Sequence, residues 1–363
     1  MLQFRILISA FCIPKTPACV FAYTSNVLEV CAMNENKKPT VALIFGGRGC
    51  EDRVSRRGRD HILPMIDKNT YSVREVFIDK DGRWLLDGVC EVFPFKGGFF
   101  SPKRNEMTPV DCAIPLLHGD FGEDGRVQGA LDCADIPYIG CDSRVGALCR
   151  DKAVVKMIAA TLDIPALPFL LLLRNEGMDY AVRRVEEKLT YPVIIKPTAL
   201  GSSVGVARVD KRENLRDGLE KLFALTDRVI AEPCLDSKRE LECGYFSAGG
   251  KEIFTNPGEI LLDGLYGYEE KYISGSTGLS IRADLPAETV ERVREYSRRI
   301  VRTLGVRGLS RIDFFLSEKE LYFNEINTMP GFTDGSLYSR MLMAEGISED
   351  RLFSLLIESA IGG

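Results

Sequence analysis

Two segments near the C-terminus, SRIDFF and FNEINT, carry the residues with the clearest potential for chemistry. Both have the apolar pattern of strands, in which alternate side chains share a face, so Arg311 lies beside Asp313 and Glu325 beside Asn327. Two carboxylates and an amide oxygen are hard ligands of the kind that Mg²⁺ takes together with water and substrate phosphates. We therefore expect a magnesium site on a pair of strands, with Glu325 placed to bridge two ions. A surface hairpin with a salt bridge is the alternative.

A glycine-serine loop, PTALGSSVG, follows Lys196 at the end of an expected strand. Its glycines free backbone N–H groups to turn toward phosphates, its serines add hydroxyl donors, and Lys196 adds a point charge. The loop lacks the GxxxxGK[ST] pattern, and the next run is again β-rich, which indicates a hairpin that folds over its ligand. The sequence favours phosphate binding here, with an ordinary turn as the alternative.

Two further loops follow buried apolar runs: GGRGCE, which ends in Glu51, and HGDFGEDG, which begins with His118. Loops at the carboxyl ends of parallel strands are where α/β sheets bind ligands. His118 taken alone is equally well explained as a partly buried structural histidine. The first loop is not GxGxxG and no ribose-binding acid follows it, so a dinucleotide-dependent oxidoreductase is not indicated.

The elements that must position these loops alternate between strand and helix up to about residue 150, which predicts a parallel α/β unit. In this unit Pro64 should end or kink the first helix. Strands are expected at 40–45, 73–78 and 112–117, with helical stretches between them. After residue 150, strands are expected at 193–196, 206–209, 228–232, 310–316 and 320–326, and helices at 214–223 and 287–304, followed by two amphipathic helices.

Composition narrows the class of protein. The chain has 363 residues, a net charge of −5 and 27% charged residues, with no basic excess for nucleic acid and no apolar run long enough for a membrane span. Its 11 cysteines are scattered without a CxxC pair, which fits reduced thiols in a cytoplasmic protein.

Residues 1–37 lack organised periodicity and are expected to be a disordered or spurious extension, with Met33 as an alternative start. Their likeness to a signal peptide is faint.

Eight motifs, in order and spanning residue 38 to the C-terminus, resemble those of the D-alanine–D-alanine ligase family of the ATP-grasp superfamily. They are FGGRGCEDRVS, LLHGDFGEDGRVQG, DKAVVK, IIKPTALGSSVGV, AEPCLDSKRELEC, GYEEKY, SRIDFF and NEINTMPGFTDGSLYSR. The resemblance implies an α/β fold: an N-terminal parallel α/β substrate domain over 38–150, then a two-part ATP-grasp (α+β) module. The module would comprise a central subdomain over 151–237 and a catalytic domain over 238–363, with ATP held between them.

The resemblance also implies a reaction and its participants. ATP and D-alanine would be the substrates, with two Mg²⁺ or Mn²⁺ ions as cofactors, and the D-alanyl-D-alanine product would serve peptidoglycan synthesis in cell wall biogenesis. The first carboxylate would become an acyl phosphate, which the amine of the second substrate then attacks. Family members are cytoplasmic and commonly homodimers; neither a membrane nor nucleic acid is expected as a partner.

Site roles carry over position by position. Glu51 would hold the first ammonium with Ser202 and Tyr272 fixing it in place, while Arg311 and the Gly331 amide would stabilise the oxyanion. The expected substrate-binding residues are His118, Ser336 and Leu337. The expected ATP-binding residues are Lys152, Lys196, Ser203, Glu232, Glu240 and Lys271. The expected metal ligands are Asp313, Glu325 and Asn327.

Three departures from the family pattern concern affinity more than activity, because none removes an expected ligand. Asp52 stands where the family usually has a larger residue, Arg282 where proline is frequent, and Asp334 with Gly335 precedes Ser336. A D-alanine–D-serine ligase is the nearest alternative function. Another ATP-grasp carboxylate–amine ligase, or a catalytically silent nucleotide-binding protein, is a further alternative, and the intact metal-ligand set argues against the silent one.

Overall fold

The computed structural model describes residues 38–235, 237–261, 278–318, 320–333 and 335–362. The expectations for residues 1–37, Lys271, Tyr272 and Asp334 lie outside this part of the chain. Residues 39–363 form one compact unit. Within the described ranges no helix is long and apolar enough to cross a membrane.

Seven strands of the described chain form the first sheet, in the order β6-β5-β4-β3-β2-β1-β7. Its parallel part has β1 (Thr40–Gly46) between β2 (Ser72–Ile78) and β7 (Cys112–Pro115). Helix α2 (Asp52–Ile62) connects β1 to β2 and ends two residues before Pro64, as predicted. Because β1 and β7 are parallel neighbours, the loops that follow them emerge at the same edge of the sheet.

The other four strands of this sheet were not expected. The segment between β2 and β7 was interpreted as helical, and that interpretation is wrong: it forms β3 (Trp84–Leu86), β4 (Cys90–Phe95), β5 (Gly98–Ser101) and β6 (Glu106–Pro109). These strands pair antiparallel in sequence order. Residues with positive φ, such as Gly97 (74°) and Asn105 (51°), close the short turns between them. The fold class is confirmed, with a mixed first sheet in place of a purely parallel one.

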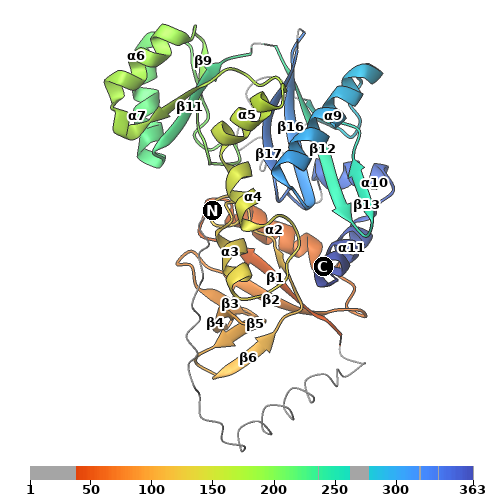
Figure 1. Cartoon of the computed structure of the whole chain (residues 1–363). Coiled ribbons are helices and arrows are strands. Elements are labelled where there is room, and N and C mark those ends of the chain that lie inside the picture. Colours follow the sequence, from red (N-terminus) through yellow and green to blue (C-terminus); the bar gives the residue numbers. More distant parts are fainter. Residues whose placement is uncertain (1–37, 236, 262–277, 319, 334, 363) are drawn as a thin grey trace, which may run out of the picture. The chain divides into compact units, whose positions relative to one another are not determined.

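The second sheet is antiparallel, in the order β10-β9-β11-β8. It contains the predicted hairpin, in which β9 (Val193–Pro197) and β10 (Ala207–Val209) flank the glycine-serine loop. Helices α6 and α7 pack beside β9 and β11 in Figure 1 and bury one apolar core with them. The other elements of this region are β8 (Leu170–Leu173), η1 (Arg174–Glu176), α6 (Met178–Lys188), η2 (Arg212–Asn214), α7 (Leu215–Leu225) and β11 (Arg228–Pro233).

The third sheet is also antiparallel, in the order β15-β14-β12-β16-β17, and β13 pairs with the C-terminal half of β12 on the edge that β14 occupies farther along. Helix α9 (Ala287–Leu304) has the predicted bounds and lies across β12, β16 and β17 in Figure 1. The strands are β12 (Arg239–Ala248), β13 (Lys251–Phe254), β14 (Gly258–Leu261), β15 (Gly278–Ser280), β16 (Gly308–Leu316) and β17 (Leu321–Asn327).

Two apolar cores join elements that are distant in sequence. One core combines Val41 and Ile114 of the first sheet with Phe353 of the C-terminal helix α11 (Glu349–Ile361). Another combines Val155 of α5 (Lys152–Thr161) with Ile312 of β16. The first and third sheets are thus joined through shared cores, whereas the second sheet buries a core of its own. The remaining helices are α3 (Arg126–Cys133), α4 (Ser143–Arg150) and α10 (Leu337–Ala344).

The cysteines in the described ranges are all free, as the sequence predicted. Cys112, Cys149 and Cys243 are buried, and burial raises the pKa of the Cys112 thiol to about 12. These thiols therefore stay protonated and serve as small apolar side chains of the core.

Candidate active site

Two adjoining cavities contain almost all the predicted site residues of the described chain. The first, of about 480 Å³, is named the lysine cavity for Lys152 and Lys196, which lie in its wall. The second, of about 440 Å³, is named the glutamate cavity for its buried acids. Ser202 and Glu325 line both, so the two cavities meet between the glycine-serine loop and β17.

Lys152 is placed at the lysine cavity by the start of helix α5. The side chain of Asp151 accepts hydrogen bonds from the N–H groups of Ala153 (2.9 Å) and Val154 (3.2 Å), which caps this helix. Lys152 Nζ then lies 3.0 Å from Glu325 Oε2 and donates to the carbonyl oxygen of Leu200 at 2.9 Å. The predicted phosphate lysine is thus held between the glycine-serine loop and the expected metal ligands.

Glu232 forms the most buried ion-pair cluster of the lysine cavity. It lies on β11, next to β9, and its carboxylate binds both Lys196 and Lys156, the latter at 2.6 Å. Burial alone would raise the pKa of Glu232, but the two lysines outweigh burial and lower it to about 2. Burial lowers the pKa of Lys156 to about 8, although Glu232 opposes the decrease. Glu232 therefore stays ionised, with each oxygen fixed by an ammonium group.

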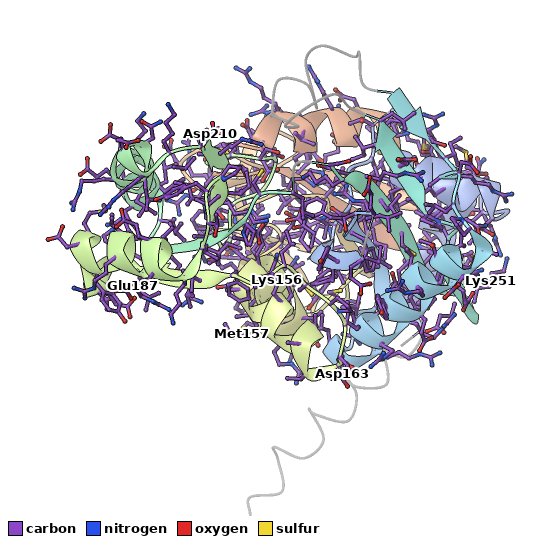
Figure 2. The ribbon with its side chains drawn as sticks, turned by 90° about the horizontal axis from the view of Figure 1, so that it is seen from above. Lys156, Met157, Asp163, Glu187, Asp210 and Lys251 are labelled. Atoms are coloured by element: carbon purple, nitrogen blue, oxygen red, sulfur yellow. The ribbon has the colours of Figure 1, made fainter. Side chains whose placement is uncertain are left out.

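Lys156 is a residue that sequence analysis missed. Its side chain is fully buried, whereas the next residue, Met157, is 46% exposed. In Figure 2 Lys156 lies near the centre of the view, while Glu187 lies toward the edge. The available signal was its spacing, four residues after Lys152, which places both lysines on one face of a helix.

Glu240 and Ser203, two of the residues expected to bind ATP, also line the lysine cavity. Glu240 lies on β12 and pairs with Lys238 at 2.9 Å, and the Lys238 ammonium also lies 3.8 Å from the centre of the Phe315 ring. Ser203 has a left-handed backbone, with φ of 59°. Its neighbour Ser202 shares this conformation, so the loop is sharply bent where it enters the cavity.

The expected metal ligands come from β16 and β17, which pair as neighbouring strands. Asp313 pairs with Glu325 across the strands, and Arg311 pairs with Asn327. Arg311 makes a two-pronged contact with Asp313, both distances 2.7 Å, and Asn327 Nδ2 donates to Asp313 at 3.1 Å. In the described residues no group of three or more His, Cys, Asp or Glu side chains forms a metal site. The two carboxylates and one amide fit Mg²⁺ only if phosphates and water complete its coordination.

A β-bulge explains why the side chain of Asn324, next to Glu325, also contacts a predicted site residue. The register of β16 and β17 shifts between Asp313 and Phe314, so that Asn324 has no direct partner across the strands. Its side-chain oxygen accepts a hydrogen bond from Lys196 Nζ at 3.3 Å. Bulges commonly redirect a side chain at functional sites, and this one connects the third sheet to the phosphate lysine.

Glu51 lies in the wall of the glutamate cavity, where helix α2 begins. It is 5% exposed and accepts a hydrogen bond from the hydroxyl of Ser202, as predicted. Gly119 lies directly against it: a Cβ atom at Gly119 would be 2.2 Å from Glu51 Oε2. The loop after β7 thus closes over Glu51 only because residue 119 has no side chain.

His118 lines the same cavity with an unsatisfied ring nitrogen. Its Nε2 atom is buried and has no hydrogen-bond partner among the described residues. Burial lowers the pKa of His118, so the imidazole is neutral at pH 7. A buried polar atom without a partner costs free energy unless a ligand satisfies it, which supports the expected role of His118 in substrate binding.

Gly331, Ser336 and Leu337 line the glutamate cavity at the start of helix α10. Ser336 Oγ accepts a hydrogen bond from the Thr333 N–H at 2.8 Å, which fixes the turn that leads into the helix. Leu337 is 6% exposed and packs against Gly258. A helix N-terminus beside a hydroxyl and an apolar wall suits a small amino acid whose carboxylate faces the helix.

Glu242, Glu123 and Arg150 were also missed by sequence analysis. Glu242 lines both cavities and lies 3.3 Å from Arg311 Nε; its position two residues after Glu240 on one strand face was a usable signal. Glu123 and Arg150 pair at 3.0 Å in the glutamate cavity. Arg150 at a helix C-terminus gave no signal, because such an arginine is normally solvated.

Comparison with known proteins agrees with this architecture. The family model for the D-ala D-ala ligase N-terminus matches residues 40–141, and the model for the D-ala D-ala ligase C-terminus matches 158–358. A D-alanine–D-alanine ligase from Caldicellulosiruptor bescii is 37% identical over 350 residues, which covers 89% of this chain and 95% of that protein.

Two solved structures are similar over nearly their whole length. The VanG D-Ala:D-Ser ligase from Enterococcus faecalis has a TM-score of 0.80 at 30% identity, covering 89% of this chain and 100% of that one. A D-alanine–D-alanine ligase from Bacillus anthracis, complexed with ATP, has a TM-score of 0.70 at 25% identity, covering 89% and 98%. The chain belongs to the D-alanine–D-alanine ligase family.

Proposed function

We propose that this protein is an ATP-dependent ligase that joins two D-alanine molecules into D-alanyl-D-alanine for peptidoglycan synthesis. The observation that carries the proposal is the junction of the two cavities at Ser202 and Glu325. A cavity with phosphate lysines opens there onto a cavity with an ammonium-binding carboxylate. Such a junction brings the γ-phosphate of ATP next to the carboxylate of an amino acid.

In this proposal ATP occupies the lysine cavity. Lys152 and Lys196 contact its phosphates, and the glycine-serine loop covers them with the hydroxyl of Ser203. The ionised Glu232 accepts the amino group of adenine, while Glu240 accepts the ribose hydroxyls and releases Lys238. Lys271, outside the described residues, would approach the γ-phosphate. Cationic groups are needed because charge develops on the transferred phosphoryl oxygens.

Asp313, Glu325 and Asn327 would hold two Mg²⁺ or Mn²⁺ ions, which would neutralise the phosphate charge and align the γ-phosphoryl group for in-line attack. These three side chains fit such ions because they offer hard oxygen donors and because their carboxylates already contact positively charged groups. Lys152 and Arg311 now provide positive charge next to these carboxylates. Arg311 also lines the glutamate cavity, where it can act on the adjoining substrate.

The first D-alanine would bind in the glutamate cavity, with its ammonium on Glu51 and its carboxylate directed to the junction. Ser202 orients Glu51, and Tyr272, outside the described residues, would complete this contact. The carboxylate oxygen attacks the γ-phosphorus, the bond to the bridging oxygen breaks, and ADP leaves with that electron pair. The products of this step are an acyl phosphate and ADP.

The second D-alanine would bind with its carboxylate on Ser336 and the N-terminus of helix α10. Its amine attacks the acyl carbonyl, and Arg311 with the Gly331 N–H stabilises the resulting oxyanion. The tetrahedral intermediate then expels inorganic phosphate and the amine loses its proton. His118 lies in the same cavity and offers a neutral ring nitrogen for contact with the substrate.

A D-alanine–D-serine ligase is the second candidate, because the VanG D-Ala:D-Ser ligase shares the fold. Leu337 favours D-alanine, since it presents an apolar wall to the side chain of the second substrate. An apolar pocket rejects an added hydroxyl only modestly, by about 10²-fold. D-serine is therefore expected to be a poorer second substrate that is still used.

The division into residues 38–150, 151–237 and 238–363 stays part of this proposal. It is supported by the three sheets, which each lie within one of these ranges. The first apolar core contains residues of the first and of the third range. The division therefore describes the three sheets better than it describes independently folding units. A homodimer in the cytoplasm is likewise proposed from the family alone.

The experiment that tests the function measures phosphate release from ATP with Mg²⁺ across a panel of D-amino acids and D-hydroxy acids. We expect release with D-alanine alone, accompanied by one D-alanyl-D-alanine per phosphate. Release that requires D-serine as a second substrate would favour the second candidate. Phosphate release without any dipeptide would contradict both.

A further inference from the structure

Arg150 is a buried cation at the glutamate cavity to which the preceding mechanism gives no role. It is the last residue of helix α4, and its side chain is only 8% exposed. Its Nε atom has no hydrogen-bond partner among the described residues. Arginine is rarely buried to this degree unless its charge is used, because desolvating a guanidinium is costly.

Three carboxylates surround this guanidinium. Glu123 Oε2 lies 3.0 Å from Arg150 Nη1, while Glu51 Oε2 and Asp120 Oδ1 each lie 3.7 Å from Nη2. Glu123 also accepts a hydrogen bond from the Gly119 N–H at 2.9 Å. Arg150 therefore connects Glu51, which follows β1, with the loop that follows β7.

Two glycines are packed against the Arg150–Glu51 pair from opposite loops. A Cβ atom at Gly201 would lie 3.0 Å from Arg150 Nη1 and 3.0 Å from Glu51 Oε2. A Cβ atom at Gly119 would lie 3.5 Å from Arg150 Nη2. The glycine-serine loop and the His118 loop thus both close on the same ion pair.

We propose that Arg150 is a positioning residue for the first D-amino acid, which it serves by holding the carboxylates of Glu51 and Glu123 in place. Two buried carboxylates in one cavity disfavour each other's charge, and a shared cation opposes this effect. The two arms of a guanidinium reach two carboxylates at once, which the single ammonium of a lysine does not reproduce. The proposal rests on the proposed ligase function, since it concerns the ammonium site of that reaction.

Arg150 acts through Glu51 and makes no contact with the reacting atoms in this account. Arg144 on the same helix provides a comparison. It is 86% exposed and pairs with Asp142 at 3.1 Å, so its role is confined to the surface end of α4. Arg144→Met therefore controls for the removal of an arginine from this helix away from the cavity.

The test compares the wild-type protein with Arg150→Met, Arg150→Lys and the control Arg144→Met, using full-length protein with ATP and Mg²⁺. Initial rates over a wide range of D-alanine concentration give separate KM values for the two D-alanine sites, and a titration of ATP gives a third. We expect Arg150→Met to raise the KM of the first D-alanine site about tenfold, because the Glu51 carboxylate loses the charged group that fixes it. The KM of ATP and the behaviour of Arg144→Met should stay close to the wild type.

Arg150→Lys should show an intermediate KM, because it keeps the charge and loses the two-armed contact. If Arg150→Met does not fold, as judged by its melting curve, a selective rise in the first-site KM of Arg150→Lys supports the proposal. Unchanged constants in either folded variant would overturn it, as would equal effects on all three KM values. Failure of the wild-type protein to form the dipeptide would instead refute the ligase function itself.

Discussion

The two cavities differ in how their charges are arranged. In the lysine cavity the cations Lys152 and Lys196 have carboxylate partners, Glu325 and Glu232, at close range. In the glutamate cavity one cation, Arg150, is shared by three carboxylates, of which Glu51 and Glu123 line the cavity. Carboxylates that share a cation can still accept an incoming ammonium, whereas paired lysines must exchange a carboxylate for phosphate or metal. In our proposal the lysines of the lysine cavity therefore exchange carboxylate partners when ATP and metal bind, whereas Glu51 keeps its contacts with Arg150 and Ser202 and gains an ammonium.

The largest expected effect comes from Glu325, which lies where the cavities meet. Glu325→Gln removes the charge proposed to bridge two metal ions, and it leaves Lys152 without its partner. We expect kcat to fall by about 10²–10³ or more, as for the loss of one strong electrostatic stabiliser. Steady-state phosphate release measures this, with circular dichroism to show an intact fold.

The matched control is Glu320→Gln, which precedes the same strand and pairs with the surface residue Arg292. It should retain wild-type activity. A folded Glu325→Gln protein with wild-type turnover would remove the metal assignment and, with it, the view that the junction is the reaction centre.

A second prediction tests the glutamate cavity through its apolar wall. We expect kcat/KM for the second substrate to decrease in the order D-alanine, D-serine, D-lactate, with D-alanine favoured over D-serine by about 10²-fold. The apolar side chain of Leu337 accounts for the preference for D-alanine over D-serine. Competition assays with product analysis by mass spectrometry measure it. A preference for D-serine would overturn the role of Leu337 and leave the ligase class intact.

A smaller effect is expected from Lys156, which contacts the lysine cavity only through Glu232. Lys156→Met removes one of the two ammonium groups that orient this carboxylate, so we expect the KM of ATP to rise about tenfold, within the range for hydrogen bonds to charged groups. The KM values of D-alanine should change little. Arg150→Met is expected to have the reverse effect on the two KM values. Together the two variants would show that ATP binding and D-alanine binding can be weakened separately.

Lys188→Met, an exposed residue of helix α6, is the control for removing a lysine. Equal changes in the KM of ATP and of D-alanine in Lys156→Met would indicate a general loss of structure and contradict the separation of the two cavities.

The sequence predicted one cavity better than the other, for a physical reason. Lys196, Asp313 and Glu325 lie on strands, where a period of two residues determines which side chains of one strand share a face. The structure brought all three to the wall of the lysine cavity. The glutamate cavity is assembled from loops after β1, β7 and β17, and the order of strands in a sheet does not follow from periodicity.

Two misses illustrate what periodicity leaves out. The strands from residue 84 to 109 are short and joined by tight turns, so their alternation was too brief to distinguish from helix. Arg150 becomes buried only because Gly119 and Gly201 from distant loops pack on it. Its surroundings depend on tertiary contacts, which local patterns do not encode.

The central claim is that the first D-alanine is activated as an acyl phosphate at the junction of the cavities. Following its carboxylate oxygen tests this most directly: D-alanine labelled with ¹⁸O in both carboxylate oxygens is supplied with ATP and Mg²⁺, and the released phosphate is analysed by mass. Attack on the γ-phosphorus transfers one carboxylate oxygen to phosphate. We predict one ¹⁸O in each phosphate released and one dipeptide per phosphate. Dipeptide formation with unlabelled phosphate would contradict the account.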